Sequence, residues 1–462
     1  MSERVSRRAF LGLMGAGMAG AALAACAPKA PQATQPPAEA TKPAEEAPTQ
    51  APEAPAAAKI IFSSYTWSGY EAAMRGLIED FMAANPTIEV EGQFVPEDYY
   101  TKLQTQIAGG TPPDVGIADY GRVVSYAKSG VLLAIGDLVA TSNFPIGDMI
   151  EGAVAQYRWA DGDFDTGAQG GELWGLPSDA QGQIFAYNKT MFDEAGVGYP
   201  TDDWTWDDLV AAGKAITNPD ANRWGFLVPH WGMQVRGYFV WQAGGEWVSP
   251  DFKTQKLDMP ETAEAWKWVW DLIYTHKVAP PPGLQAATNP FMSGQVAMTI
   301  DGVWWVADFA NITDFEWDLA LLPKHPKTGK RTTSVESDGW WIFKATKEVE
   351  ASWMLMSHLA NKDGQRKFGE LNYVIPSCFP EVGEEWYTQK PPDNRKKALD
   401  NLVQDSRKAY ITHFEVWTIL GQCMPPIDAA LTDGTPIEPA IQEAAQIMQD
   451  ELDKAWELYN QT

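Results

Sequence analysis

The pattern of hydrophobic positions between residues 59 and 118 switches repeatedly between a strand period and a helix period. Short apolar runs alternate with longer stretches whose large apolar side chains recur three and four positions apart, which is the spacing of one helical face. Such alternation is typical of a parallel sheet with helices on its faces. The pattern predicts strands at 59–63, 88–94 and 114–118 and helices at 71–84 and 99–108.

A second region of the same kind begins after Glu172. Residues 183–187 have the apolar character of a strand, and Thr205 precedes an acidic first turn, which is typical of a helix N-terminus. Pro260 starts a further helix, and its apolar residues share one face. We expect this face, formed by Trp266, Val269, Trp270 and Ile273, to be buried in the core.

Composition narrows the classes of function. The 462 residues suggest two or three domains, and the net charge of -26 argues against a nucleic-acid partner. The five His residues show no metal-ligand spacing, and no phosphate-cradling motif is present, so we expect no cofactor. The three Cys residues exclude a disulfide scaffold, and whether Cys378 and Cys423 pair is left open.

The sequence of the first 58 residues predicts an export signal followed by a disordered tether. Residues 1–26 contain Arg7 and Arg8, a Gly/Ala-rich apolar stretch and small residues before Cys26, which together indicate an export signal. The segment SRRAFL resembles the twin-arginine export motif, and LAAC resembles the bacterial lipobox, in which Cys26 becomes the acylated first residue. Gly12 replaces the usual Lys of the twin-arginine motif, so the export route stays open. Residues 27–58 are rich in Ala and Pro and predict a disordered tether.

Five segments, in this order along the chain, carry a resemblance to the family-1 extracellular solute-binding proteins, which include maltose-binding protein. They are TWSGYEAAMRGLIEDFMAANPTIEV, YYTKLQTQIAGGTPPDV, YNKTMFDEAGVGYPTDDWTWDDL, FMSGQVAMTIDGVWWVADF and SVESDGWWIF. The resemblance implies an α/β, two-lobed periplasmic-binding-protein-like fold of type II, with discontinuous lobes joined by a hinge near residues 176–181. We place the first lobe at 59–178 plus 316–345 and the second at 179–315 plus 346–462.

A site for a sugar combines aromatic rings with carboxylate and amide groups, because sugars present hydroxyls and an apolar C–H face. Several such combinations follow predicted strands, where ligands of open α/β sheets bind. Trp304 resembles the family's stacking residue, and Trp231 occupies a position similar to another aromatic contact. Core packing is the alternative for Trp304, and a helix cap is the alternative for Asp119. Alternation along a strand sends the adjacent Trp340 and Trp341 to opposite faces, so one should be core, and we expect Trp340 and Asp338 to face the cleft. The candidate ligand contacts are Trp67, Tyr70, Asp119, Tyr120, Asp179, Gln181, Trp231, Asp301, Trp304, Asp338 and Trp340.

One acidic stretch matches some oxygen-ligand positions of a calcium loop. Asp161, Asp163, Asp165 and Glu172 have suitable spacing, but Thr166 stands where such a loop needs Gly. A solvated acidic turn is the reading that we favour, and no metal is expected.

The expected function is that of a lipid-anchored, extracytoplasmic receptor of an ABC importer. It would bind a sugar without chemical change, act as a monomer and deliver its ligand to permease subunits. A polyamine is the alternative ligand, since acidic and aromatic groups also suit a cation. A surface-anchored glycoside hydrolase is the alternative activity.

Overall fold

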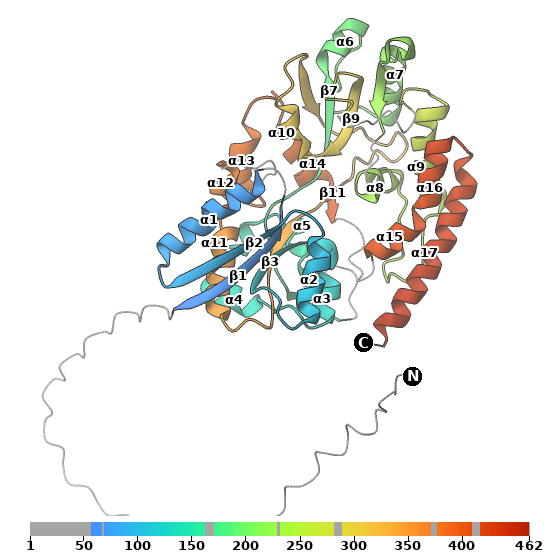
Figure 1. The fold of residues 1–462 in the computed structure, drawn as a ribbon. Helices are drawn as coiled ribbons and strands as arrows, with labels where there is room; N and C mark the ends of the chain where they lie inside the picture. The colour runs from blue at the N-terminus through green and yellow to red at the C-terminus, as the bar shows by residue number, and fades with distance from the viewer. Residues whose placement is uncertain are drawn as a thin grey trace, which may run out of the picture. The chain divides into compact units, whose positions relative to one another are not determined.

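The computed structural model describes residues 57–66, 69–161, 171–228, 232–280, 289–370, 377–408 and 416–461. The chain divides into two units, Met1–Ala54 and Pro55–Thr462. All of the described residues lie in the second unit (Figure 1).

The first sheet has five strands in the order β2-β1-β3-β12-β6. Strands β1, β2 and β3 are parallel, as the sequence pattern predicts, whereas β12 is antiparallel to both of its neighbours. The strand β12 comes from far along the chain and separates β3 from β6. The bounds are β1 (Ala58–Tyr65), β2 (Ile88–Val95), β3 (Val115–Asp119), β6 (Leu176–Pro177) and β12 (Asp338–Ile342).

Helices from both ends of the sequence pack around this first sheet. The predicted helices are present as α1 (Tyr70–Ala84) and α2 (Tyr99–Ala108), and α3 (Val123–Lys128) follows β3. Three later helices, α11 (Val349–Ala360), α12 (Lys362–Glu370) and α13 (Pro380–Tyr387), continue the same buried core. We call the first sheet and these helices the first lobe. It also includes α4 (Gly136–Ser142), α5 (Glu151–Ala155), β4 (Arg158–Trp159), β5 (Glu172–Leu173) and the short turns η2 (Tyr120–Arg122) and η3 (Ile146–Asp148).

The second sheet has four strands in the order β10-β7-β9-β8. Strand β7 is antiparallel to β10 and β9, and β8 is parallel to β9. All residues of β7 and β9 are buried, which is typical of strands covered on both faces. The bounds are β7 (Gln183–Asn188), β8 (Trp224–Leu227), β9 (Val296–Gly302) and β10 (Trp317–Ala320).

The second sheet and its helices form what we call the second lobe. In α9 (Pro260–Tyr274) the residues Trp266, Val269 and Ile273 are buried as predicted. Trp270 is only half-buried, and its indole donates to the Thr435 carbonyl at 3.0 Å. The other elements are α6 (Lys189–Ala195), α7 (Trp206–Ile216), η4 (Pro219–Ala221), α8 (Gly232–Ala243), α10 (Trp305–Phe309), α14 (Lys397–Asp405), α15 (Val416–Cys423), α16 (Pro425–Asp433) and α17 (Ile437–Tyr459).

Two expected lobe assignments do not agree with the strand pairing and packing. Strand β10, expected in the first lobe, pairs with β7 of the second sheet. Helices α11 and α12, expected in the second lobe, pack against elements of the first sheet and against α1, and α13 packs against α12. The second crossing, at residues 333–338, contains neither Gly nor Pro, so the sequence pattern did not reveal where the chain returns to the first sheet.

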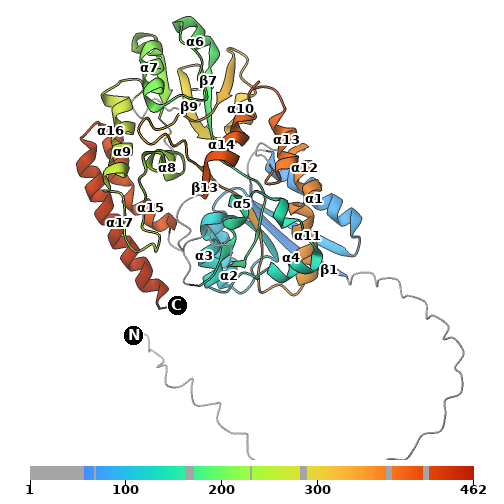
Figure 2. The same ribbon diagram turned by 180° about the vertical axis from the view of Figure 1, so that it is seen from behind.

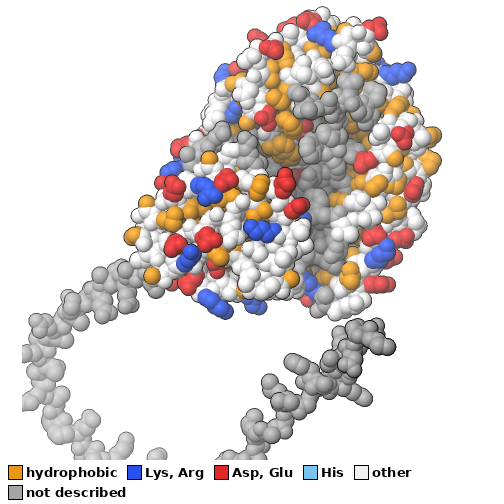
Figure 3. Space-filling model, viewed as in Figure 1, with side chains coloured by type: hydrophobic (Ala, Val, Ile, Leu, Met, Phe, Trp, Pro, Cys, Tyr) orange, Lys and Arg blue, Asp and Glu red, His pale blue; other side chains and the backbone are white. Residues whose placement is uncertain are grey.

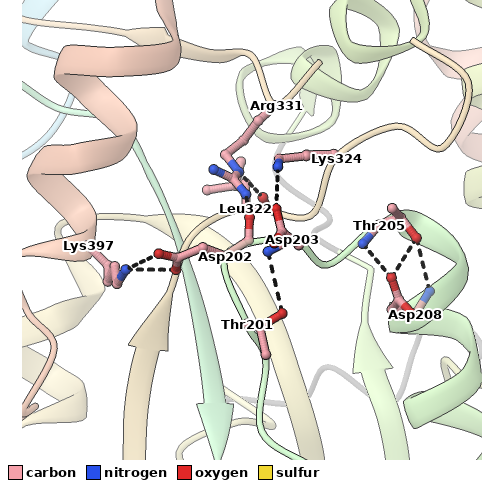
Figure 4. A network of polar contacts seen from close by, with 9 residues as sticks. All are labelled: Thr201, Asp202, Asp203, Thr205, Asp208, Leu322, Lys324, Arg331 and Lys397. Carbon is pink, nitrogen blue, oxygen red and sulfur yellow. Dashed lines mark hydrogen bonds and ion pairs between the residues drawn. The ribbon is translucent and has the colours of Figure 1, made fainter. Parts of the chain in front are cut away.

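A polar network fixes the loop before α7 against neighbouring segments of the second lobe (Figure 4). The buried Arg331 guanidinium donates to the Leu322 carbonyl at 2.6 Å and also to the Asp202 carbonyl. Lys397 lies 2.7 Å from the Asp202 carboxylate. The loop ends in the expected cap, because Thr205 and Asp208 form a reciprocal capping box.

Cys378 and Cys423 are both buried and free. Each belongs to a different hydrophobic cluster, so the two thiols do not pair. On the outside, Figure 3 shows acidic and basic side chains interspersed over the described surface in that view. Among the described residues, no helix has the length and apolar character needed to cross a membrane.

Candidate functional site

Two crossing segments connect the two sheets and lie side by side. Residues 178–182 join β6 to β7, and residues 333–338 contain β11 (Thr333–Val335) and lead into β12. The Gln181 N–H donates to the Glu336 carbonyl at 2.8 Å, and the Glu336 N–H donates back to Gln181 at 2.9 Å. On its other side β11 pairs in parallel with β13 (Ser406–Lys408). The chain therefore passes between the lobes as a small paired ribbon.

Asp179 is the hydrogen-bonding centre of this ribbon. Its carboxylate accepts from the Ser178 hydroxyl at 2.8 Å and from the Gln181 amide at 3.1 Å. It also accepts from the backbone N–H of Asp338 at 3.3 Å. The side chain is only 2% exposed, although burial at this position was not expected from the sequence. Burial, together with the negative charge of Asp338, raises the pKa of Asp179 well above its ordinary value.

Glu336 adds a second buried carboxyl group to the crossing. Its side chain accepts a hydrogen bond from the Ser334 hydroxyl at 3.1 Å. Burial raises the pKa of Glu336 to about 8, with a further contribution from the charge of Asp338. The backbone N–H of Ser334 donates to the side-chain carbonyl of Gln183 at 3.1 Å, so the polar groups of the two segments form one continuous network.

Asp338 is half-buried and faces aromatic residues of β1 and α1. Its side chain is hydrogen-bonded with Tyr65, and its charge also acts on the buried Tyr70. Tyr70 in turn accepts a hydrogen bond from Ser64 at 3.0 Å. Hydroxyl, carboxyl and aromatic groups of the first lobe thus meet where the crossing segments leave it.

Asp301 and Trp304 lie at the end of β9 in the second lobe. The Asp301 carboxylate accepts from the Gly302 N–H at 2.8 Å, and burial raises the pKa of Asp301 to about 7. Trp304 is half-buried and packs partly against the hydrophobic core. A Cβ on Gly302 would lie 2.1 Å from the Trp304 ring, so the indole is folded directly over the Gly302 backbone.

Two predicted contacts belong to the core. Tyr70 is buried at the start of α1, and its ring packs edge-on against Phe368 at 5.6 Å between centroids. Trp340 is only 1% exposed, and its neighbour Trp341 is fully buried. We expected alternation to leave Trp340 on an open face, but β12 is an interior strand whose two faces are both covered.

Several candidates cannot be placed. Trp67 and Trp231 lie outside the described residues, as do Asp163 and Asp165. The backbone of Asp119 pairs with Asp338, while the side chains of Asp119 and Tyr120 are not described. Asp161 forms an ion pair with Lys128 at 3.1 Å, and no cluster of metal-ligating side chains occurs among the residues that the structure describes.

Sequence reasoning missed two members of the site. Glu336 lies two residues before Asp338 in the segment SVESDGWWIF, so the same alternation that selected Asp338 could have found it. Tyr65 ends the first strand, where ligand contacts of α/β sheets gather. Its partner Asp338 lies far away in the sequence, and no sequence signal links Tyr65 with Asp338.

The site presents hydrogen-bonding groups and an aromatic surface. Carboxyl, amide and hydroxyl groups lie at the crossing, and an indole lies at the end of β9. A separate surface groove of about 690 Å³ lies between α15, α16 and α17. Its lining is mostly Pro and Ala, including Pro425, Pro436 and Ala440, so it offers few groups that could orient a polar ligand.

Comparison with known proteins identifies the fold and the family. An ABC substrate-binding protein from Listeria monocytogenes, solved in complex with cycloalternan, is 26% identical, covers 86% of this chain and 99% of its own, and has a TM-score of 0.75. This likeness confirms the expected two-lobed, type II periplasmic-binding-protein fold.

Curated relatives agree with this likeness. A binding protein of Brucella abortus is 25% identical over 337 residues, which cover 71% of this chain and 77% of the relative. An arabinooligosaccharide-binding protein of Halalkalibacterium halodurans is 25% identical over 242 residues, half of this chain and 53% of that protein. The model of the bacterial extracellular solute-binding protein family matches residues 67–366. The chain belongs to this family of extracellular solute-binding proteins.

Proposed function

We propose that this protein is the monomeric, extracytoplasmic receptor of an ABC importer and that it binds a carbohydrate between its two lobes without altering it. The observation that carries the proposal is the hydrogen-bonded cluster of Asp179, Gln181, Glu336 and Asp338 at the crossing. A ligand that reaches this cluster would contact the two crossing segments that connect the lobes. Trp304 would supply the apolar surface on which a sugar ring stacks.

The protonation of the acids favours a neutral ligand over a polyamine. Burial raises the pKa of Asp179 and Glu336, and that of Asp301 to about 7. Glu336 and Asp301 therefore carry less negative charge at neutral pH than two fully ionised carboxylates would, which weakens their attraction for a cation. A neutral carboxyl group can both donate and accept hydrogen bonds, which suits sugar hydroxyls. The Listeria and Halalkalibacterium relatives, named with cycloalternan and arabinooligosaccharide, support the same class of ligand.

The anchor and the motion are further parts of the proposal. Cys26, at the end of an export signal, would be acylated and would hold the folded unit near the permease through residues 27–58. The lobes would turn about residues 176–181 and close on the ligand, because a ligand that contacts both lobes binds the closed state better. The radius of gyration from small-angle scattering should fall when a saturating ligand is added.

A thermal-shift screen tests the ligand class. Cycloalternan, arabino-oligosaccharides and maltodextrins form one arm, and putrescine and spermidine form the other. We expect the midpoint to rise only with carbohydrate, because a ligand that binds the native state stabilises it by mass action. A rise with spermidine alone would overturn the proposal. Recovery of the intact carbohydrate after prolonged incubation is expected, and hydrolysis products would instead favour a glycoside hydrolase.

A further inference from the structure

Three side chains join the C-terminal helix to the first lobe at a point away from the crossing segments. The Tyr459 hydroxyl, in the last residue of α17, donates to the Asp161 carboxylate. The Lys128 ammonium lies 3.1 Å from the same carboxylate. It also lies over the Tyr459 ring, 4.0 Å from its centroid. Each of the three residues therefore contacts both of the others.

These residues belong to different parts of the fold. Lys128 ends α3, and Asp161 follows β4, so both are in the first lobe. Helix α17 packs against α15, α16 and α9 of the second lobe, and its C-terminal end approaches α3 in both ribbon views (Figures 1 and 2). The contact is therefore made between the lobes.

Buried apolar groups accompany the polar contact. Val124 and Ala127 of α3 and Trp159 of β4 belong to the same hydrophobic cluster as Tyr459, although most of that cluster lies in the second lobe. Separation of the lobes at this point would expose these apolar side chains to water. The polar triad and the apolar contact thus favour the same arrangement.

The environment of Lys128 differs from that of an ordinary surface ion pair. Exposed ion pairs contribute little because water screens them. Here the Lys128 side chain is only 19% exposed, whereas Asp161 is 67% exposed. A partly desolvated ammonium gains more from an aromatic face than an exposed one. Lys128 is the central member, because it makes both the ion pair and the cation–π contact.

We propose that Lys128, Asp161 and Tyr459 form an interlobe latch that holds α17 against the first lobe in the absence of ligand. Helix α3 follows β3 after the short turn η2. The latch itself requires no ligand and does not rest on the proposed function.

Hydrogen–deuterium exchange of the full, ligand-free chain tests the latch. Lys128→Met removes the charge and keeps the length of the side chain, and Tyr459→Phe removes only the hydroxyl. Matched controls remove the same groups within one lobe. Lys454→Met breaks the Lys454–Glu451 pair inside α17, and Tyr199→Phe breaks the Tyr199–Asp193 hydrogen bond. Lys128→Arg is the conservative rescue, because a guanidinium can keep both contacts.

The latch predicts that both of its faces loosen together. In Lys128→Met, amides of α3 and of the last turns of α17 should exchange about two to five times faster, because a desolvated contact of this kind shifts local opening by that factor. Tyr459→Phe should show a smaller change at the same places, and Lys128→Arg should restore protection. Neither control should alter exchange in α3.

Two results would overturn the latch. Faster exchange confined to the end of α17, with α3 unchanged, would mean that Tyr459 only prevents fraying of its own helix. Equal effects of Lys454→Met and Lys128→Met on α3 would mean that charge, not contact, is responsible. Because no ligand is present in this experiment, these outcomes are independent of whether carbohydrate proves to be the ligand.

Discussion

The backbone N–H of Asp338 donates to a carboxylate oxygen of Asp179 at 3.3 Å, across 159 residues of sequence. This bond joins the two segments by which the chain crosses between its sheets. The residues that we propose as ligand contacts are therefore also the residues that hold the crossing together. Substitutions here should affect folding and binding to different extents, which allows the two roles to be separated.

Asp179→Ala should destabilise the protein by about 1 to 3 kcal/mol, because it leaves buried donors without their acceptor. The donors are the Ser178 hydroxyl, the Gln181 amide and the Asp338 N–H. Asp179→Asn retains an acceptor oxygen and should cost less. Urea unfolding measures both, with the exposed Glu97→Ala as control. Equal stability of Asp179→Ala and the parent chain would show that these bonds do not hold the crossing.

Glu336 should make stability depend on pH in a defined direction. Its pKa is about 8 in the folded chain, above the ordinary value for Glu, so the folded state holds the proton more tightly. Its contribution is fully present below about pH 4.5 and is lost as the pH rises through 8, by up to about 1.4 kcal/mol per pH unit. Glu336→Gln should flatten this fall and be more stable than the parent at pH 8.5. Urea unfolding at pH 5 to 8.5 measures the free energy of unfolding of both proteins. Parallel pH profiles for the two proteins would contradict the prediction.

Trp304→Ala should weaken carbohydrate binding more than it lowers the unfolding midpoint. A fully buried Trp costs about 3 to 5 kcal/mol when truncated, but Trp304 is half-buried and should cost less. Calorimetric titration and thermal melts of the ligand-free variant measure the two effects. A large fall in midpoint with unchanged affinity would place Trp304 in the core alone.

Gly302→Ala offers an independent perturbation of the same indole. The new Cβ would lie 2.1 Å from the Trp304 ring, so the ring must shift. Affinity should fall even though Trp304 itself is unchanged. If Gly302→Ala binds as the parent does, the position of this indole does not determine affinity.

Cys26→Ala should abolish membrane attachment. The full chain expressed in a bacterium that processes lipoproteins should partition into detergent, and mass spectrometry should find an acylated Cys26 at the mature N-terminus. The variant should partition into the aqueous phase or stay unprocessed. An unmodified Cys26, or cleavage elsewhere, would contradict the proposed anchor.

The sequence predicted local structure well and long-range pairing poorly. Helix 99–108 and the cap at Thr205 were predicted from spacing and side-chain chemistry, because both depend on neighbours in sequence. The placement of β10 and of α11 to α13 did not agree with the structure, because it depends on contacts between segments that are far apart in the sequence. Trp340 was misjudged for a related reason, since alternation shows that two faces exist but not that both are covered.

The interior position of β12 sets an order for the folding of the chain. Among the described strand pairings, β6 joins the first sheet through β12 alone. Strand β12 lies more than 150 residues after β6 in the sequence. A growing chain that has not reached Ile342 can pair β1, β2 and β3 but cannot yet add β12 and β6 to this sheet. Contacts so distant in sequence slow folding, since a long loop must be ordered before they form. The first lobe is therefore completed only after all four strands of the second sheet have been synthesised, and fragments that end between the lobes should not fold independently.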